Sequence, residues 1–385
     1  MRLFPITIRR SASWSFTRLR SSLSPAVPAG FHRFLKSIPR MVTLVVAGLA
    51  VPALADPVVP LRVKVVIVTL FEVGEDTGDR PGEFQFWVER EHLTNRVSVP
   101  GAWRPVRYRD DGVVGICTGG GTARSAASIT ALGLDTRFDC SKAYWITAGI
   151  AGIDPADGTL GCAAWAEYVI DGDLAHEIDA REMPADWSTG YVPLSQPKPY
   201  ALPRKTRGVG NVVFPLNKSL VDWAFRLTQD TPLPETDVMR ANRARYTNHP
   251  AALRSPFVLK GDNLAGSTFW HGRLLNQWAN DWVKYWTDGA GNYVTTAMED
   301  SGTLQALTFL AEAGRADTNR VLVLRTASNF DQQPPGKTAA ESLAEENGGK
   351  FSAYLPSLES AYRVGSRVLH ELVGGWSRYE KEIPR

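Results

Sequence analysis

A glycine-rich turn, Cys117-Thr-Gly-Gly-Gly-Thr-Ala-Arg124, separates an expected strand from an expected helix. Backbone N–H groups exposed at the start of a helix bind anions and polar oxygens, and Arg124 would add a positive charge. The run is neither a Walker loop nor a G-x-G-x-x-G fingerprint, and it lacks the lysine of a nucleoside triphosphate site. A tight structural turn explains the same residues equally well, so both interpretations stay open.

A second group of polar residues forms an acidic loop after the first expected strand. Its carboxylates are Glu72, Glu75, Asp76, Asp79 and Glu83. A carboxylate that follows a central strand can serve as a general base. A solvated loop is the simpler interpretation of these residues taken by themselves.

The segment from Asp171 to Asp179 has the acidic composition of a calcium loop but not its pattern. A calcium loop needs an oxygen ligand and then a glycine where this chain has Ala175 and His176. The chain also has no H-E-x-x-H motif and no clustered Cys and His spacing. The sequence therefore predicts no metal and no resident cofactor.

Two further segments place polar groups at the ends of elements. Ala297-Met-Glu-Asp300 precedes an expected helix, and Arg325-Thr-Ala-Ser-Asn-Phe-Asp331 lies at the end of an expected strand. A set of aromatic residues is expected to pack in the core instead of forming a site. Its spacing of three to four residues puts it on one face of a helix. Its members are Trp278, Trp282, Tyr285 and Trp286.

The elements that must position these residues alternate between strand and helix. This alternation predicts one three-layer α/β domain over residues 56–385, with a central mixed sheet flanked by helices and ligands bound at strand ends. A Pro-rich stretch, 184–215, is expected to be an irregular insertion. We expect strands over 61–69, 104–109, 113–117, 143–147, 163–170, 257–260 and 320–326, and helices over 123–132, 271–286, 301–314 and 351–373.

Residues 1–55 have the features of an export leader. They contain eight basic and no acidic side chains, and an apolar segment over 41–55 ends in Ala53-Leu-Ala55. These features are typical of a secretory signal peptide. We expect cleavage after Ala55, export to the periplasm or the cell exterior, and no membrane integration afterwards. The alternative is an uncleaved membrane anchor.

The charge balance changes once this leader is set aside. The whole chain has 43 Lys and Arg against 40 Asp and Glu, so residues 56–385 have 35 basic and 40 acidic side chains. A negative domain without a basic patch is a poor candidate for nucleic-acid binding. No apolar stretch of about 20 residues follows the leader, which argues against an autonomous channel or carrier. Three cysteines allow one disulfide at most, so stability must come from a core.

Taken in order, these segments resemble the nucleoside phosphorylase and nucleosidase superfamily, and more closely the purine nucleoside permease family. The resemblance covers nearly all of residues 62–380 and implies a nucleoside phosphorylase-like fold with a purine nucleoside as ligand. The closer match rests on the segments Glu83-Phe-Gln-Phe-Trp-Val-Glu-Arg-Glu91, Phe257-Val-Leu-Lys-Gly-Asp-Asn263, Phe269-Trp-His-Gly272, Ala297-Met-Glu-Asp300 and Leu324-Arg-Thr-Ala-Ser-Asn329.

The resemblance also implies roles for individual residues. Glu72 or Glu75 would activate an attacking water, and Asn329, with Asp331 as a rival, would support the leaving purine at N7. Glu299 would accept hydrogen bonds from the ribose hydroxyls. Met298 would pack against the ribose, and the other pocket residues would be Gly119, Gly120, Gly121, Thr122, Ala148, Gly149, Ile150, Asp262, Asn263 and Leu264.

Three functions stay open: a nucleosidase that uses water, a phosphorylase that uses phosphate as co-substrate, and a non-catalytic nucleoside-binding protein that supports uptake. Bacterial phosphorylases have an arginine just before the glycine segment after the third strand, where this chain has Ile146. Only Arg124 or Arg80 is left to bind phosphate, which favours water as the nucleophile. A homodimer or higher oligomer is expected, because superfamily members often complete their pockets with a neighbouring subunit.

Overall fold

Two strands rich in β-branched residues start the central sheet. β2 (Val65–Thr69) pairs in parallel with β5 (Val113–Cys117) and with β7 (Tyr144–Ile153). All five residues of β2 are buried, which fits a strand that is covered on both faces. The computed structural model describes residues 59–204, 211–349 and 353–385, so the expected leader, 1–55, lies outside the described residues.

The sheet divides at β7, which is ten residues long. β16 (Val321–Phe330) pairs with it in parallel, and the end of β7 pairs antiparallel with β15 (Tyr293–Ala297). The remaining strands extend the sheet in three directions. They are β14 (Asp262–Ala265), β9 (Tyr168–Asp171) and β12 (Val213–Pro215) beyond β15; β4 (Val106–Arg109) and β3 (Asn95–Val97) beyond β5; and β8 (Ala163–Trp165) with β13 (Val258–Lys260) beyond β16.

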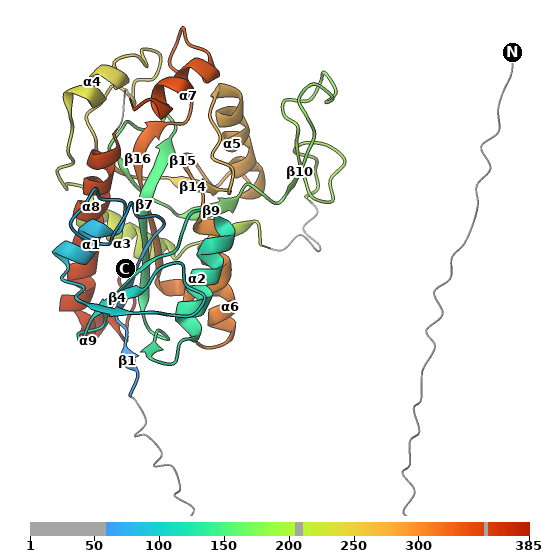
Figure 1. The fold of residues 1–385 in the computed structure, drawn as a ribbon. Coiled ribbons are helices and arrows are strands. Elements are labelled where there is room, and N and C mark those ends of the chain that lie inside the picture. The colour runs from blue at the N-terminus through green and yellow to red at the C-terminus, as the bar shows by residue number, and fades with distance from the viewer. Residues whose placement is uncertain (1–58, 205–210, 350–352) are drawn as a thin grey trace, which may run out of the picture. The chain divides into compact units, whose positions relative to one another are not determined.

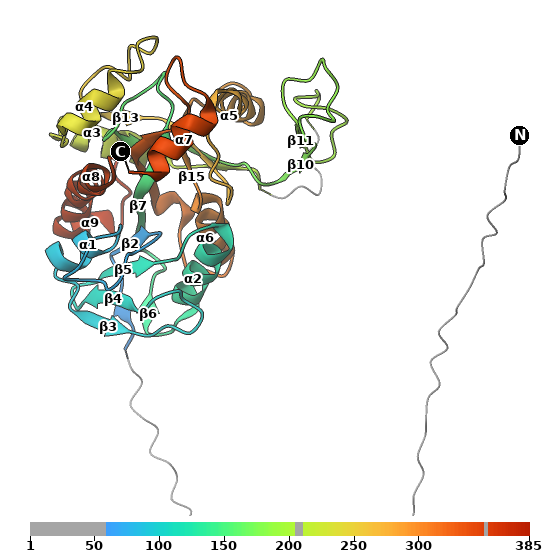
Figure 2. The same cartoon turned by 45° about the horizontal axis from the view of Figure 1, so that its top comes forward.

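Helices lie on both sides of the sheet, so the predicted three-layer α/β arrangement is confirmed (Figures 1 and 2). α8 (Tyr354–Gly374) packs on β7 and β16, and α2 (Thr122–Leu134) packs with α6 (Asp300–Glu312) on the opposite side. α5 (Arg273–Trp286) contacts β14 and β15. The shorter helices are α1 (Gln85–Arg90), α3 (Lys218–Thr228) and α9 (Trp376–Tyr379) beside α8, with α4 (Asp237–Arg243) and α7 (Ala339–Asn347) in the loops.

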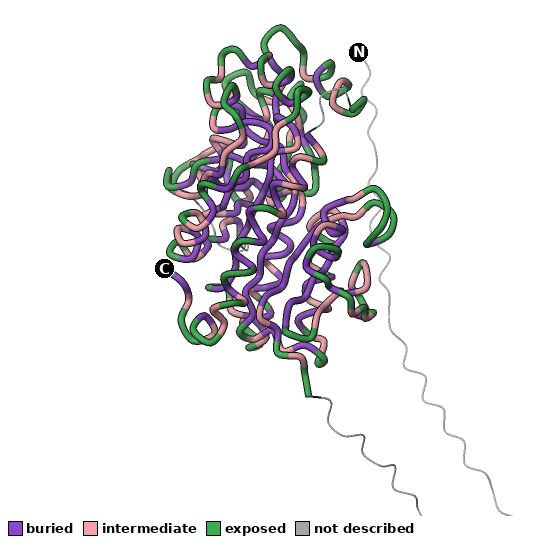
Figure 3. Tube along the Cα trace, turned by 90° about the vertical axis from the view of Figure 1, so that its left-hand side faces the viewer, coloured by how far each residue is buried: buried purple, intermediate pink, exposed green. Residues whose placement is uncertain are grey.

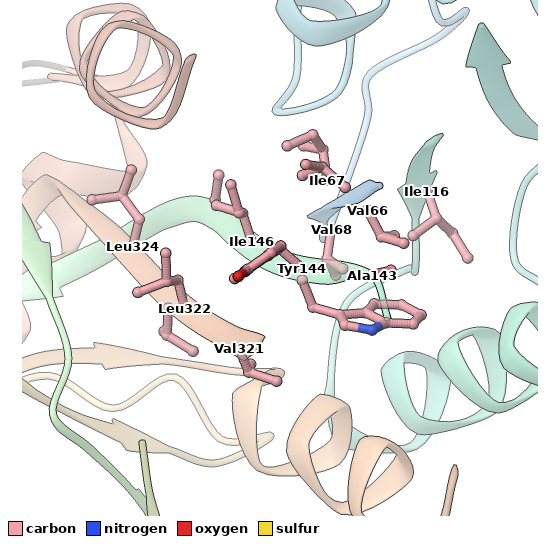
Figure 4. Packing of buried hydrophobic residues seen from close by; sticks show 14 of the residues in the cluster. Val66, Ile67, Val68, Ile116, Ala143, Tyr144, Ile146, Val321, Leu322 and Leu324 are labelled. Atoms are coloured by element: carbon pink, nitrogen blue, oxygen red, sulfur yellow. The ribbon is translucent and has the colours of Figure 1, made fainter. Parts of the chain in front are cut away.

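The apolar core lies along the central strands, and exposed residues gather in the loops at the ends of the domain (Figure 3). Val68 of β2, Ile146 of β7 and Leu322 of β16 are completely buried and belong to one cluster (Figure 4). Burying one such side chain contributes roughly 1.5–3 kcal/mol. Trp278, Trp282 and Trp286 on α5 form part of a separate buried cluster, so the predicted core-facing aromatic stripe is confirmed. The cysteines Cys117, Cys140 and Cys162 are buried and free.

The stretch 163–170, predicted as one strand, is two strands. The Ala166 N–H donates to the carbonyl of Val323, whereas the N–H groups of Glu167 and Tyr168 donate to the Asp262 carboxylate at 3.1 and 2.8 Å. The chain therefore leaves β16 after β8 and joins β14 as β9. The hydrophobic pattern of residues 163–170 gives no sign of this change of neighbouring strand.

The expected insertion at 184–215 is part of a longer excursion that begins near residue 172. β10 (Ala175–Glu177) and β11 (Tyr191–Pro193) form an antiparallel hairpin that projects from the rest of the domain (Figure 1). β12 then returns the chain to the edge of the sheet beside β9. Residues 205–210 lie outside the described residues.

Candidate active site

A cavity of about 200 Å³ lies where β2, β15 and β16 end and where β7 passes beneath them. Cavities of this kind at the carboxyl ends of strands are the usual ligand sites of α/β sheets. Most of the wall is apolar, and the ionisable part consists of two carboxyl groups and one guanidinium. The lining residues are Leu70, Phe71, Glu83, Ile150, Ala151, Phe269, Ala297, Met298, Glu299, Arg325, Ser328 and Asn329.

Glu83 is the carboxyl group that the acidic loop brings into the cavity. Its two oxygens accept the N–H groups of Leu70 and Ile150, each at 2.7 Å, and the residue is 5% exposed. Burial raises the pKa of this carboxyl to about 8, because Arg325 lowers the pKa less than burial raises it and Glu299 raises it further. Glu83 therefore keeps its proton at neutral pH and loses it close to pH 8, a range suited to acid–base chemistry.

Arg325 enters the cavity from β16 and is 1% exposed. Its Nη2 donates to Oε2 of Glu299 at 3.2 Å, its Nε donates to Oδ2 of Asp300 at 2.9 Å, and its Nη1 donates to the carbonyl of Ile150 at 3.1 Å. A buried guanidinium needs such partners, because an unpaired charge in this position would be strongly destabilising. Arg325 thus fixes the carboxylate of Glu299 at the edge of the cavity.

Glu299 links the cavity to the glycine-rich turn. Its Oε1 accepts the N–H of Gly121 at 3.2 Å, and Oε2 accepts the N–H of Met298 at 3.2 Å. Burial raises the pKa of Glu299, and the ion pair with Arg325 opposes that rise. The turn therefore contributes a backbone donor to the carboxylate, and Gly121 adopts φ +90°, which favours glycine.

Gly149 on β7 lies directly beneath the charged groups. A Cβ atom added there would lie 2.6 Å from Nη1 of Arg325 and from Cδ2 of Leu70, and 2.8 Å from Oε1 of Glu83. The glycine therefore lets Arg325 and Glu83 meet over the strand, and the next residue, Ile150, lines the cavity. Ala148, by contrast, is completely buried in the sheet.

Asn329 provides the amide of the cavity, at the end of β16. Its Oδ1 accepts the hydroxyl of Ser328 at 2.9 Å, and its Nδ2 donates to the carbonyl of Phe330 at 3.2 Å. Met298 and Phe269 supply apolar surface in the same cavity. Apolar walls with one amide at the edge suit a planar heterocycle that carries polar atoms on its rim.

Glu72 and Glu75, the predicted bases, do not line the cavity. Oε2 of Glu72 accepts the N–H groups of Phe84 and Gln85 at 2.8 and 2.6 Å, so its carboxylate holds the start of α1. Glu75 is exposed. Of the five acidic residues in this loop, the one that reaches the cavity is Glu83.

Asp331, the predicted rival of Asn329, lies behind the cavity rather than in its wall. It is 1% exposed and accepts the hydroxyl of Tyr293 and the Nδ2 of Asn276, the latter at 3.1 Å. Burial raises the pKa of Asp331 well above its usual value. The structure therefore brings Asn329, and not Asp331, next to Glu83 and Glu299.

The predicted base-pocket segment 262–264 is divided between different surroundings. Asp262 accepts backbone N–H groups at the bend between β8 and β9, and Asn263 donates to Asp300 at 2.6 Å. Leu264 lines a separate cavity of about 240 Å³ at the base of the β10–β11 hairpin. None of the three lines the cavity that contains Glu83.

The two predicted anion-binding arginines also lie outside the cavity wall. Nη1 of Arg124 donates to the carbonyl of Gly120 at 3.0 Å, and its guanidinium lies 5.0 Å from the centre of the Trp103 ring, which packs against Gly119. Thr122 starts α2 and is hydrogen-bonded to Ser267 rather than exposed to the cavity. Arg80 lies 5.3 Å from the ring centre of Tyr354.

Glu83 and Arg325 line the cavity, although the sequence analysis named them only within longer segments and gave neither a role of its own. Arg325 had a usable signal, because a basic residue inside the apolar run Val321–Thr326 needs a buried partner. Glu83 had the signal shared by all five carboxylates of the acidic loop, and the family resemblance pointed to Glu72 or Glu75 instead. In the described part of the chain, no group of three or more His, Cys, Asp or Glu could hold a metal ion.

Comparison with known proteins gives the family. A model of the purine nucleoside permease family matches residues 62–384. A purine nucleoside permease of Candida albicans is 30% identical over 327 residues, which cover 83% of this chain and 77% of the relative. A probable purine nucleoside permease of Schizosaccharomyces pombe is 30% identical over 271 residues, which cover 68% of this chain and 75% of the relative.

Solved structures give more distant matches. A 5′-methylthioadenosine/S-adenosylhomocysteine nucleosidase of Streptococcus pneumoniae has 16% identity and a TM-score of 0.47, and the match covers 80% of this chain and 98% of the other. Futalosine hydrolase of Helicobacter pylori has 14% identity and a TM-score of 0.47 with the same coverage. On the family match and the 30% identity to its curated members, the chain belongs to the purine nucleoside permease family.

Proposed function

We propose that the cavity binds a purine nucleoside and that water cleaves its N-ribosidic bond there. The family supports a purine nucleoside as the ligand. The observation that carries the cleavage step is Glu83, a buried carboxyl group that faces the same cavity as Glu299, Arg325 and Asn329. A buried carboxyl group beside an amide, an arginine and a second carboxylate in one cavity supports acid–base chemistry there.

In the proposed reaction Glu83 accepts a proton from water as the water oxygen attacks C1′ of the ribose. The C1′–N9 bond breaks, its electron pair goes to the purine, and the products are free base and ribose. Positive charge develops on the sugar in the transition state, as in glycoside hydrolysis. The carboxylate of Glu299, which lines the same cavity as Glu83, would stabilise that charge.

The other side chains hold the substrate. Glu299 accepts hydrogen bonds from the ribose hydroxyls, and Arg325 keeps its carboxylate in place. The amide of Asn329 hydrogen-bonds the edge of the purine, and Met298 packs against the ribose. Asn329 cannot supply a proton, so the purine takes its proton from solvent or leaves as an anion that the amide stabilises.

The charges of the cavity favour water over phosphate. The guanidinium of Arg325 is already paired with the carboxylates of Glu299 and Asp300, and Glu83 would add a further negative charge once ionised. A phosphate dianion beside these carboxylates would be repelled. Neither Arg80 nor Arg124 lines the cavity to offset that repulsion.

The test is incubation of the protein with inosine or adenosine, with and without inorganic phosphate, followed by chromatography of the products. We expect free base and ribose at equal rates in both buffers. Strict dependence on phosphate, with ribose 1-phosphate as product, would overturn the hydrolytic step and leave the nucleoside site standing. Tight nucleoside binding without any product would overturn cleavage altogether.

The second candidate function is nucleoside binding in support of uptake. The observation that favours it is the name permease that the curated relatives carry. Among the residues that the structure describes, no helix has both the length and the apolar composition needed to cross a bilayer. Binding without turnover in the experiment above is the result that selects this function.

A further inference from the structure

A chain of buried polar groups lies beneath the cavity floor. The hydroxyl of Thr295 donates to Oδ1 of Asn263 at 3.1 Å, and Nδ2 of Asn263 donates to Oδ2 of Asp300 at 2.6 Å. The same Asp300 oxygen accepts Nε of Arg325 at 2.9 Å and forms an ion pair with its Nη2, also at 2.9 Å. Of these four residues only Arg325 lines the cavity, so Asp300 acts on any ligand through Arg325.

Asp300 is a charged residue in an unusual position. It starts α6, directly after Glu299, and is 0% exposed. Asn263 and Thr295 on the neighbouring strands β14 and β15 are also almost completely buried. Oδ2 of Asp300 has Nδ2 of Asn263 and two nitrogens of Arg325 within hydrogen-bond distance, so the carboxylate can hold the guanidinium in one orientation, whereas its Oδ1 has no hydrogen-bond partner among the described residues.

The guanidinium of Arg325 therefore interacts with three carboxyl groups. Arg325 is paired with Asp300 and Glu299 and meets Glu83 over Gly149. The other titratable groups that face Glu83 are Cys117 on β5 and Tyr354 on α8, whose pKa values are both raised to about 12 by burial. Neither group changes charge near neutral pH, so Arg325 and its carboxyl partners determine how the site responds to pH.

We propose that Asp300, anchored by Asn263, is the positioning residue that orients Arg325 toward Glu299 and Glu83 and thereby sets the pH range in which the site works. The inference rests on the proposed hydrolysis and adds to it a residue that does not touch the substrate. The negative charge of Asp300 offsets part of the positive charge of Arg325. Arg325 therefore lowers the pKa of Glu83 less than it would without Asp300. Asn263 contributes orientation only, because it carries no charge.

The charge and the orientation can be separated by two substitutions. Asp300→Asn keeps the shape but frees the Arg325 charge, so we expect the acidic limb of the kcat/KM profile to move to lower pH by about one unit. Asn263→Ala keeps every charge but removes the side chain that anchors Asp300. We expect the acidic limb to stay in place and kcat to fall about tenfold, because small displacements of catalytic groups lower the rate by up to 10²-fold.

Asp262→Asn is the matched control. Asp262 is a buried carboxylate on the same strand as Asn263, but it binds backbone N–H groups away from Arg325. We expect this variant to lose thermal stability without any movement of the acidic limb. An Asp300→Asn profile that coincides with the wild-type profile would show that Asp300 is structural and would overturn the inference.

The outcomes also distinguish this inference from the proposed function. If the wild-type chain binds inosine but does not cleave it, the proposed hydrolysis is wrong. The inference is then tested by calorimetry, which measures how inosine affinity depends on pH, in place of kcat/KM. Asp300→Asn should then move the pH midpoint of affinity to lower values, and an unmoved midpoint overturns the inference. If Asp300→Asn does not fold, a kcat or affinity for Asn263→Ala equal to the wild-type value overturns it instead.

Discussion

Glu83 is the residue on which the proposed chemistry depends. A Glu83→Gln substitution keeps the size of the side chain but removes the group that accepts the water proton. We expect kcat to fall by about 10²–10⁴-fold, the usual contribution of general-base catalysis, with KM little changed. In the wild-type chain kcat/KM should rise with pH toward a midpoint of about 8, because the carboxylate is the active form.

Steady-state kinetics between pH 5 and 9 would measure both effects. Glu89→Gln is the control, since Glu89 is an exposed carboxylate on α1, close to the same loop. Full activity of Glu83→Gln, or a pH profile without a limb near 8, would contradict the role of Glu83 and return attention to Glu72.

Glu299 is the second residue with a measurable role. A Glu299→Gln substitution removes an anionic acceptor, and hydrogen bonds to charged groups are worth about 1.5–3 kcal/mol. Nucleoside affinity should therefore fall by roughly tenfold or more. Isothermal titration calorimetry with inosine would measure it, with the exposed Glu312 at the end of α6 as the site of a control Glu→Gln change. Unchanged affinity would mean that the Glu299 carboxylate only holds the glycine-rich turn and Arg325 in place.

At the scale of single residues, the sequence predicted some of the residues that line the cavity and not others. Ile150, Met298, Glu299 and Asn329 were named from the sequence and line the cavity. Glu83 was one of five candidate carboxylates but was not preferred over Glu72 or Glu75, because it lies 13 residues beyond Leu70, whose N–H it binds. A contact of that kind depends on how the loop folds back, and neither residue spacing nor composition encodes it.

At the scale of elements, the packing of α6 against α2 depends on a glycine. A Cβ atom on Gly302 would lie 2.2 Å from the carbonyl oxygen of Thr122, at the point where the two helices start. We expect Gly302→Ala to destabilise the fold by roughly 1–3 kcal/mol, as overpacked sites usually do. Activity should fall as well, because both helices begin beside Glu299 and the glycine-rich turn.

Chemical denaturation would measure the loss of stability. Gly374→Ala is the matched control: Gly374 lies in α8, has no atom within 4 Å of an added Cβ, and should gain about 0.5–1 kcal/mol from the better helix propensity of alanine. Equal stabilities of the two variants would contradict the close contact between α6 and α2.

The elements with strong patterns were the ones that could be predicted. The strand predicted over 61–69 forms mainly as β2, with the short strand β1 (Leu61–Arg62) before it, and the helix predicted over 271–286 forms as α5. β15, α3 and α4 were not predicted, and the seven residues of α4 are too few to show a clear helical period. β15 contains Thr295 and Thr296 in buried positions, which only its neighbours in the sheet make favourable.

At the scale of the whole molecule, several buried carboxyl groups make stability depend on pH. Burial raises the pKa of Glu83 to about 8, of Glu346 to about 7 and of Asp262 to about 6. The folded chain therefore holds more protons than the unfolded chain between the ordinary pKa near 4 and these raised values. Stability contributed by these groups is complete below that window and is lost as the pH rises through it.

We expect the melting temperature to fall between about pH 5 and pH 8. His271 acts in the opposite direction, since burial lowers its pKa and favours folding as the pH rises through its ordinary value. Scanning calorimetry in steps of half a pH unit would record the sum, and Glu83→Gln should make the decline shallower. A melting temperature that rises steadily toward pH 8 would contradict this account.

The sharing of Arg325 among three carboxyl groups has a consequence for the heat of ligand binding. At neutral pH Glu83 keeps its proton, whereas the proposed reaction needs its carboxylate. Each nucleoside that is captured in reactive form must then expel one proton to the buffer. On the proposed mechanism the apparent binding enthalpy should scale with the ionisation heat of the buffer, and a lower pH should oppose capture by mass action, so that nucleoside occupancy would be coupled to the surrounding proton concentration.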